Sequence, residues 1–233
     1  MRVKPFRFLA EARAVANGRE LAETARRAEA HGIDTLVIPD HLVEQLAPIP
    51  AMATIVAATE KLRVAGFVLN NDLRHPAVLA QDLASVDVLS DGRLDVAMGA
   101  GWNRPEYEAI GIPFERAPVR QARLAEAITV LKGCFADGPF SFAGEHYTIT
   151  DYDALPKPIQ RPHPPFFVGG GGRRTMTLAD VRRRSSAWRH GSCRTVPAIP
   201  HRSPSPPRRR RSHGRGRPPA RVPTSSSSTS TPR

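Results

Sequence analysis

The sequence predicts a parallel α/β fold, either a doubly wound sheet or the first part of a (β/α)8 barrel. Apolar runs without polar alternation, the pattern of strands buried on both faces, start at residues 34, 62 and 94. These starts are 28 and 32 residues apart, which is close to the roughly 30 residues of a βα unit. Patterns typical of helices fall before and between these runs, so strands and helices alternate along the chain.

The first strand and helix precede these runs. Residues 6–10 read as a strand, and Asn17 then caps a helix that has Glu20 at its third position. Gly32 is placed to end this helix. The second strand follows directly, at residues 34–39.

A helix joins the third and fourth strands, which span residues 62–69 and 94–98. Pro76 occupies its first turn, where the missing backbone N–H costs no hydrogen bond, and the turn residues 90–92 stop it. One face of this helix is apolar and consists of Leu79, Leu83 and Val86.

Beyond the fourth strand the pattern is looser. We expect a loop over residues 99–118, a long helix with an apolar stripe, a hairpin at 139–150 and a fifth strand at 166–168. The stripe consists of Leu124, Ile128, Leu131 and Phe135. Residues 1–180 therefore form one α/β domain with about five strands, which would be an incomplete barrel if the fold is of that type.

Residues 181–233 are a different kind of sequence. They hold 14 Arg, no Lys, no acidic residue, and no Leu, Phe, Tyr or Met. Since residues 1–180 hold 20 basic and 22 acidic residues, the net charge of +12 comes entirely from this tail. A segment with so few apolar residues is expected to be disordered. Its Arg, Pro and Ser content is typical of GC-rich DNA translated out of frame, an interpretation that we favour over a basic nucleic-acid-binding arm.

The composition also excludes some classes of protein. No apolar run reaches the roughly 20 residues of a membrane helix, and the N-terminus lacks the apolar region of a signal peptide. We therefore expect a cytoplasmic protein that does not bind membranes. Cys134 and Cys193 form neither a disulfide framework nor a zinc-ligand spacing, which predicts no metal site.

Candidate site residues follow the predicted strands, because ligands of parallel α/β folds gather at the carboxyl ends of strands. Asp40 and His41 follow the second strand, and an imidazole beside a carboxylate suits proton transfer near neutral pH. The alternative is that Asp40 caps a helix and His41 only packs. Asn70 and Asn71 follow the third strand, where adjacent amides either bind a flat heterocycle or make a turn.

Two loops contain several glycines. The loop 99–106 starts with two glycines that let a ligand approach the backbone, and Trp102 offers an apolar wall. The fifth strand runs into a glycine run before a helix N-terminus, and this run consists of Gly169, Gly170, Gly171 and Gly172. Their backbone N–H groups, together with Arg173 or Arg174, favour a phosphate site over a flexible turn.

Taken together, these stretches resemble the luciferase-like flavin and deazaflavin oxidoreductases, particularly the F420-dependent branch. The resemblance covers about residues 3–180 and rests on the order and spacing of short motifs. These are LVIPDH at 36–41, NNDLRHP at 70–76, LSDGRL at 89–94, GAGWNR at 99–104, GEHY at 144–147 and PIQRPHPP at 158–165, followed by the glycine run.

The resemblance implies a (β/α)8 barrel with its cofactor across the carboxyl ends of the strands, which favours the barrel over the doubly wound sheet. It implies coenzyme F420, with FMN as the alternative, a small-molecule substrate and a homodimer. Nothing after residue 180 matches the family, so the resemblance implies a truncated or frameshifted chain that lacks three strands.

Carried over by position, the resemblance assigns roles to individual residues. Asp40 and His41 would face the reactive edge of the deazaflavin, with His41 as the acid or base, and a non-prolyl cis peptide would lie at Gly66–Phe67. The cofactor would contact Gly66, Phe67, Leu69, Asn70, Gly101, Trp102 and Asn103, and its phosphate would bind Gly169, Gly170, Gly171, Gly172 and Arg173.

The resulting hypothesis is an oxidoreductase that moves hydride between a deazaflavin and a small organic substrate, while His41 handles the proton. An FMN-dependent monooxygenase is the enzymatic alternative. Two other classes stay open from the residues alone: a hydrolase with Asp40 and Glu106 as paired carboxylates, and an Arg-rich nucleic-acid-binding protein.

Overall fold

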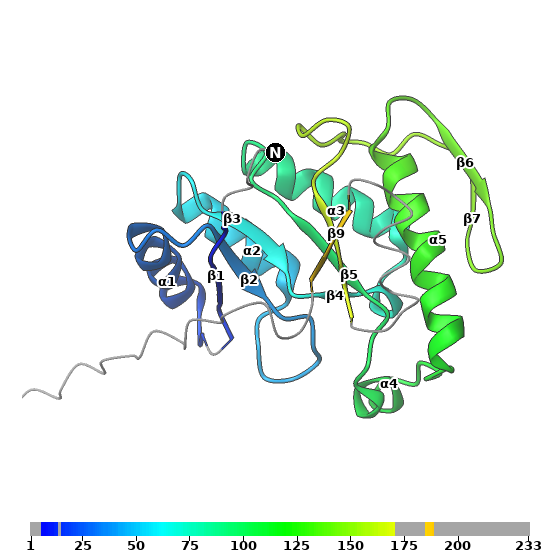
Figure 1. Cartoon of the computed structure of the whole chain (residues 1–233), viewed down its shortest axis with the longest axis horizontal. Helices are drawn as coiled ribbons and strands as arrows, with labels where there is room; N and C mark the ends of the chain where they lie inside the picture. The colour runs from blue at the N-terminus through cyan, green and yellow to red at the C-terminus, as the bar shows by residue number, and fades with distance from the viewer. Residues whose placement is uncertain (1–5, 14, 171–184, 189–233) are drawn as a thin grey trace, which may run out of the picture. The chain divides into compact units, whose positions relative to one another are not determined.

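Short parallel strands form two sheets that follow one another around an incomplete barrel (Figure 1). The computed structural model describes residues 6–13, 15–170 and 185–188. The first sheet has the order β1-β2-β3 and the second the order β4-β5-β8-β9. A parallel bridge between Val64 and Leu94 connects them. The strands are β1 Leu9–Glu11, β2 Thr35–Ile38, β3 Arg63–Gly66, β4 Leu69–Asn70, β5 Val96–Gly99, β8 Phe166–Gly169 and β9 Ser185–Trp188.

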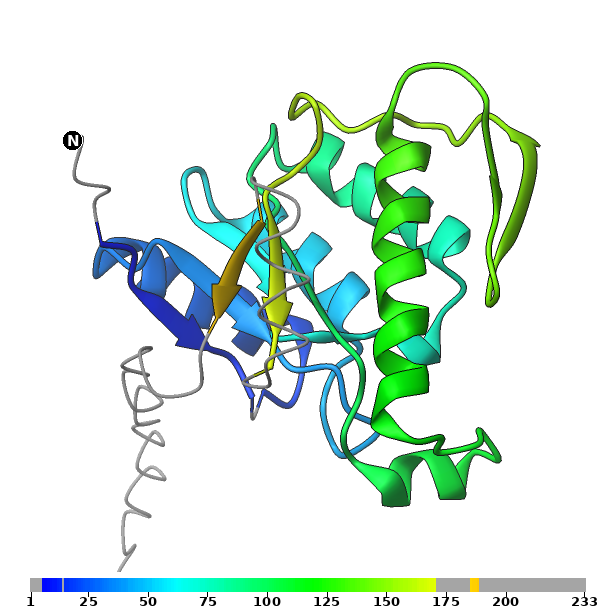
Figure 2. The same cartoon turned by 45° about the vertical axis from the view of Figure 1, so that its right-hand side comes forward.

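All described residues lie in one compact unit, Met1–Ile199, and a second unit, Pro200–Arg233, falls outside them. The helices of the first unit are α1 Gly18–Ala30, α2 Pro48–Ala58, α3 Pro76–Leu89, α4 Arg104–Ala109 and α5 Ala117–Phe135, with a 3-10 turn, η1, at Asn71–Leu73. A hairpin of β6 (Phe140–Ala143) and β7 (Thr148–Tyr152) lies on the far side of α5 from the sheets (Figures 1 and 2). In the described part of the chain, no helix has both the length and the apolar character that crossing a membrane requires.

Both faces of β2 and β5 are buried, as their unbroken apolar runs predict. Side chains on one face, such as Leu36 and Val64, belong to the large core that the helices share. Side chains on the other face, Val37 and Ala65 among them, form a smaller cluster with Leu9. This second face corresponds to the interior of a barrel, so the sheets bury apolar area on both sides.

The capping signals of the sequence are confirmed in α1. The Asn17 side chain accepts a hydrogen bond from the backbone N–H of Glu20, at 3.1 Å, and the Glu20 carboxylate accepts from the backbone N–H of Ala16, at 2.9 Å. Gly32, just past the helix, has a φ of 74°. The predicted apolar faces of α3 and α5 are buried as well.

The prediction of one continuous third strand over residues 62–69 is wrong. The segment is split into β3 and β4, which belong to different sheets, and the peptide bond between Phe67 and Val68 is cis. The cis bond that the resemblance placed at Gly66–Phe67 therefore lies one residue later. The shift follows from strand pairing, since the Phe67 backbone N–H still donates to the Ile38 carbonyl at 2.7 Å and the chain turns only after it.

Two helices were not predicted. The sequence pattern assigned no helix to α2, whose residues are apolar on nearly every side and therefore lack a helical stripe. The loop predicted over 99–118 contains α4, a helix of six residues, too short for a periodic pattern. The predicted first strand also starts later than expected, at Leu9.

The predicted boundary between a domain at 1–180 and a disordered tail at 181–233 falls largely outside the described residues. Within that tail the structure describes Ser185–Trp188, which form β9 and pair in parallel with β8. These four residues form a strand, whereas the sequence predicts disorder for them.

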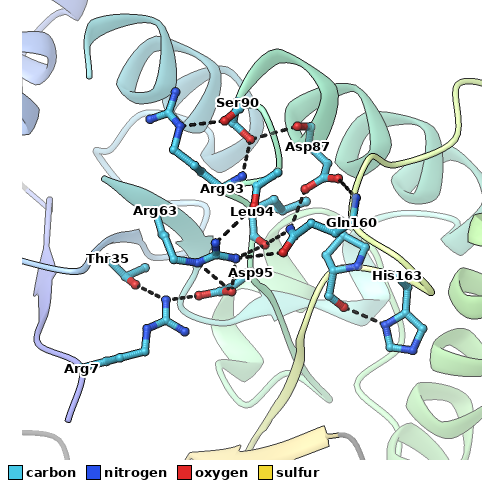
Figure 3. A network of polar contacts seen from close by, with 12 residues as sticks. Arg7, Thr35, Arg63, Asp87, Ser90, Arg93, Leu94, Asp95, Gln160 and His163 are labelled. Carbon is cyan, nitrogen blue, oxygen red and sulfur yellow. Dashed lines mark hydrogen bonds and ion pairs between the residues drawn. The ribbon is translucent and has the colours of Figure 1, made fainter. Parts of the chain in front are cut away.

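A polar network ties the amino ends of the strands together (Figure 3). The buried Asp95 carboxylate accepts from Arg63 at 2.6 Å and from Arg7 at 2.5 Å. Gln160, from the proline-rich stretch before β8, donates to the Asp87 carboxylate on α3 at 2.7 Å. The network therefore fixes the amino end of the barrel and leaves the opposite, carboxyl end for a ligand site.

Candidate functional site

The carboxyl ends of β2, β4 and β5 bring the predicted site residues of these strands into one cluster. Asp40 and Asn70 are hydrogen-bonded to each other across the ends of two strands, at 2.8 Å. His41 contacts both Trp102 and Glu106, which lie on the loop and the helix after β5. The topology therefore unites residues that are widely separated in sequence.

His41 and Glu106 form a polar pair at the centre of this cluster. The His41 Nδ1 atom lies 3.0 and 3.2 Å from the two Glu106 carboxylate oxygens. Glu106 is buried, whereas the His41 side chain is 26% exposed. Since a carboxylate only accepts hydrogen bonds, the proton lies on Nδ1, and Nε2 is the nitrogen that can exchange a proton with a ligand. No described residue hydrogen-bonds to Nε2.

Trp102 lies against this imidazole. The two ring centroids are 5.4 Å apart and the rings meet edge to face, at 79°. The Trp102 side chain is 73% exposed, so it presents an apolar surface beside the reactive nitrogen. The neighbouring Asn103 is half-buried, and among the described residues its side chain has no hydrogen-bond partner, not even as the cap of α4.

Asp40 does not have the position that the resemblance implied. Its carboxylate is almost completely buried and forms a two-pronged ion pair with Arg74, at 2.6 and 3.0 Å. It also accepts from the backbone N–H of Asn70. Because all of these partners are internal, Asp40 holds the ends of β2 and β4 together instead of facing a ligand, and the carboxylate beside His41 is Glu106.

The contacts of Asp40 and Glu106 do not support the hydrolase hypothesis. That reaction requires two carboxylates that act on one substrate. Asp40 is engaged by Arg74, and Glu106 is engaged by His41. The two carboxylates are thus held by different partners.

Asn70 is part of a buried polar cluster behind the site. Its carboxamide oxygen accepts from the Tyr107 hydroxyl at 3.0 Å, and the same hydroxyl lies 3.1 Å from the Asp72 carboxylate. Arg123 of α5 pairs with Asp72 at 3.0 Å. Burial raises the pKa of Tyr107 to about 12; the Asn70 hydrogen bond opposes this shift and the Asp72 charge adds to it. The carboxamide oxygen of Asn70 is therefore already occupied. The residue serves to position the loop.

Gly101 packs against the same polar cluster. Its φ is 72°, a conformation that favours glycine. A side chain at this position would overlap the Tyr107 hydroxyl and the Asn70 carboxamide. The glycine therefore makes room for the polar cluster, and its contact with a cofactor stays a prediction.

The predicted ring-contacting residues of the third strand have different surroundings. Leu69 is fully buried in the main core and fills the space beside Gly66, so these two residues present no surface to a ligand. Phe67 is partly buried on the other face, against the cluster of Leu9, Val37 and Ala65. Of the three, Phe67 alone faces the interior of the barrel.

The glycine run after β8 is described only at its start. Gly169 lies at the carboxyl end of β8, and Gly170 follows with a φ of 139°. A side chain on Gly169 would overlap Val68, which also lies beside Gly99 of β5. Gly171, Gly172 and Arg173, predicted to hold a phosphate, lie outside the described residues.

Sequence reasoning missed three participants. Glu106 was considered only as a hydrolase acid, Arg74 was assigned no role, and Tyr107 was not noticed. Arg74 lies within the motif 70–76, and Glu106 and Tyr107 lie just after the motif 99–104. Their proximity to the site was therefore visible, but their partners were not.

Comparisons with known proteins identify the family and the fold. The family model described as luciferase-like monooxygenase matches residues 4–181. An FMNH2-dependent dimethylsulfone monooxygenase from Pseudomonas putida is 40% identical over 134 residues, which cover 58% of this chain and 36% of the relative. An F420-dependent glucose-6-phosphate dehydrogenase from Kineococcus radiotolerans is 32% identical over 164 residues, with 66% and 47% covered.

A solved structure shows the same fold. The coenzyme F420-dependent tetrahydromethanopterin reductase from Methanopyrus kandleri superposes with a TM-score of 0.68 at 22% identity, over 74% of this chain and 52% of the other. The chain thus spans about a third to a half of the length of these three proteins. The fold is the luciferase-like type of (β/α)8 barrel, present here in part.

Proposed function

We propose that this chain, which belongs to the luciferase-like monooxygenase family, is an oxidoreductase that uses the deazaflavin F420 to oxidise or reduce a small organic substrate. The curated relatives include enzymes named as F420-dependent and as FMNH2-dependent. The choice between the two cofactors is therefore part of the proposal.

The observation that carries the proposal is the His41–Glu106 pair. Hydride transfer between a deazaflavin and a carbonyl or alcohol carbon leaves a proton to be added to, or removed from, the substrate oxygen. His41 Nε2 can exchange that proton, because Glu106 holds Nδ1 at 3.0 Å and stabilises the imidazolium that forms. The His41 side chain is 26% exposed and can contact a ligand, whereas Glu106 is buried. His41 is therefore the acid or base, and Glu106 orients it.

The residues around this pair are suited to a flat, anionic cofactor. Trp102 supplies an exposed aromatic surface, and Asn103 an amide that no described side chain or backbone group engages. Gly169 and Gly170 lie at the end of β8, where backbone N–H groups can bind phosphate. Phe67 lies on the inner face and excludes water from that side.

The second candidate is an FMN-dependent monooxygenase, because the 40% identical relative is named as one. In that case His41 would serve the same proton chemistry on a different substrate. The two candidates share the site and differ in the cofactor that binds it.

Cofactor retention distinguishes these candidates. The full chain is incubated separately with F420 and FMN, passed through a desalting column, and the retained cofactor is measured by fluorescence. We expect F420 to be retained with at least tenfold higher affinity, which corresponds to about 1.4 kcal/mol. Selective retention of FMN would establish the monooxygenase instead, and retention of neither would refute both.

Two variants test the site itself. Trp102→Ala should weaken cofactor retention at least fivefold because it removes the aromatic surface. Tyr152→Ala, which removes a partly exposed aromatic ring from the hairpin strand β7, is the matched control and should leave retention unchanged. His41→Gln should retain the cofactor and lose turnover of a secondary alcohol, since a carboxamide of similar length cannot exchange a proton near neutral pH.

A further inference from the structure

The His41–Glu106 pair joins two segments that are far apart in the sequence. His41 lies just beyond β2, and Glu106 lies on α4, a helix of only six residues. A helix this short is not stable by itself. The position of the Glu106 carboxylate therefore depends on the contacts that α4 makes with the rest of the fold.

Tyr107, the residue after Glu106, anchors this helix. Its side chain is fully buried, and its ring meets Phe114 edge to face, with the centroids 5.0 Å apart. Its hydroxyl lies 3.0 Å from the Asn70 carboxamide oxygen and 3.1 Å from the Asp72 carboxylate. A buried hydroxyl that loses its partners costs free energy, so these contacts favour one position of α4 over others.

Asn70 contacts the sequence neighbours of both members of the pair. Its backbone N–H donates to the carboxylate of Asp40, which precedes His41, at 2.8 Å. Its carboxamide oxygen accepts from the hydroxyl of Tyr107, which follows Glu106. One residue of β4 thus connects the segment that carries the imidazole with the segment that carries its carboxylate.

The other contacts of this bridge keep Asn70 in place. Asp40 is held by Arg74 at 2.6 and 3.0 Å. The Asn70 carboxamide oxygen also accepts from the backbone N–H of Asp72, at 3.1 Å. Because these contacts do not involve Tyr107, we expect the loss of its hydroxyl to displace α4 and not Asn70.

The His41–Glu106 contact is sensitive to such a displacement. The His41 Nδ1 atom lies 3.0 and 3.2 Å from the two Glu106 oxygens, and hydrogen bonds of this kind are lost beyond about 3.5 Å, so a shift of less than about 1 Å separates the two groups. The hydrogen bond made by one imidazole nitrogen decides which nitrogen carries the proton. The position of α4 therefore decides which nitrogen of His41 is available to a ligand.

We infer that the Tyr107 hydroxyl is a positioning group: through its contact with Asn70 it holds the Glu106 carboxylate at His41 Nδ1 and so keeps Nε2 free to exchange a proton. Tyr107 acts through Glu106 and has no contact of its own with the imidazole within the described chain. The role of Nε2 rests on the proposed function, whereas the orientation of the imidazole does not.

The tautomer of His41 measures this role directly. The full chain is labelled with ¹⁵N-histidine, and long-range ¹H–¹⁵N correlation spectra are recorded at about pH 9, where an imidazole is neutral. The chain has eight histidines, and the His41→Gln variant identifies the His41 signals by their loss. In the parent protein we expect the proton on Nδ1. In Tyr107→Phe, which keeps the ring, the ratio of the Nδ1–H form to the Nε2–H form should fall about fivefold or more.

Tyr147→Phe is the matched control. Tyr147 lies between β6 and β7, and its partly buried hydroxyl accepts from the Asn71 side-chain amide at 3.2 Å. Burial raises its pKa, as it does for Tyr107. A loss of stability alone should not move the tautomer, so this change should leave the ratio within about twofold of the parent. Equal effects of the two changes, or no effect of Tyr107→Phe, would overturn the inference.

Asn70→Ala removes the other partner of the same contact and keeps the backbone N–H that binds Asp40. It should lower the tautomer ratio as Tyr107→Phe does, and the double variant should lower it no further, because both changes remove one interaction. Near-ultraviolet circular dichroism shows which variants keep the native packing. If neither single variant folds, the inference is overturned, because the contact is then a requirement of folding and not of positioning.

The parent protein and the cofactor complete the set of outcomes. A parent spectrum with the proton on Nε2 would overturn the inference outright. The spectra are recorded without a cofactor, so their outcome does not depend on cofactor retention. A chain that shows the expected shifts but retains neither F420 nor FMN keeps this inference about the orientation of His41 and loses the proposed function.

Discussion

Removing Arg74 should destabilise the protein more than removing any exposed arginine. Arg74→Met deletes the guanidinium that makes both ion-pair contacts to Asp40, at 2.6 and 3.0 Å, but keeps much of the side chain's apolar length. The Asp40 carboxylate then stays buried with a single donor, the backbone N–H of Asn70. An unpaired buried charge is the costliest product of such a change.

The expected magnitude follows from this geometry. Breaking a buried ion pair by removing one partner costs about 3–5 kcal/mol. The Asp40 side chain is 2% exposed, but that of Arg74 is 22% exposed, and one hydrogen bond remains, so we expect the lower end, about 3 kcal/mol. For a chain of this size, each kcal/mol lowers Tm by about 2–4 °C, which gives a decrease of about 6–12 °C.

Urea unfolding followed by circular dichroism measures this loss, with Arg104→Met as the matched control. The Arg104–Glu108 pair is exposed on both sides and 3.7 Å long, and such pairs contribute about 0–1 kcal/mol. Adding Asp40→Asn to Arg74→Met should restore about 1–2 kcal/mol, because it removes the buried charge. The reasoning fails if Arg74→Met costs no more than Arg104→Met, or if the second substitution restores nothing.

Three further outcomes are expected. Gly101→Ala should cost about 1–3 kcal/mol in urea unfolding, because a positive φ is combined with overlap on Tyr107; an unchanged midpoint would contradict it. In a spectrophotometric titration of folded protein, Tyr107 should ionise only near pH 12, and Tyr107→Phe should remove that step. Burial raises the pKa of Glu126, but hydrogen bonds from the backbone of residues 145–147 outweigh it, so this pKa lies below the ordinary 4.5. Glu126→Gln should therefore cost about 1 kcal/mol at pH 7, a difference that shrinks as pH falls below 4.5; a constant difference would refute it.

Local signals in the sequence were sufficient for much of the fold. The cap of α1 joins Asn17 and Glu20, which are three residues apart, and the hairpin strands β6 and β7 are close neighbours in the chain. Such contacts form between residues that stay near one another in any conformation, so they are visible as short patterns. The helix α2 was missed because apolar residues on all of its sides conceal the helical period.

The site shows the limit of that reasoning. The strand pattern placed Asp40 and His41 at the rim of the sheet, and the structure agrees with that position. The strand pattern could not show which carboxylate pairs with the imidazole, and the prediction was the adjacent Asp40. Sequence adjacency is a poor guide there, because neighbouring residues at a strand end point in different directions.

The sequence alone therefore determined most of the alternation of strands and helices, the cap of α1 and the end of the barrel that carries polar residues. Only the tertiary structure decided that Asp40 pairs with Arg74, 34 residues away, and His41 with Glu106, 65 residues away. The physical reason is that a charge selects its partner among the groups that the packed strands bring within about 3 Å, and local sequence carries no record of that distance.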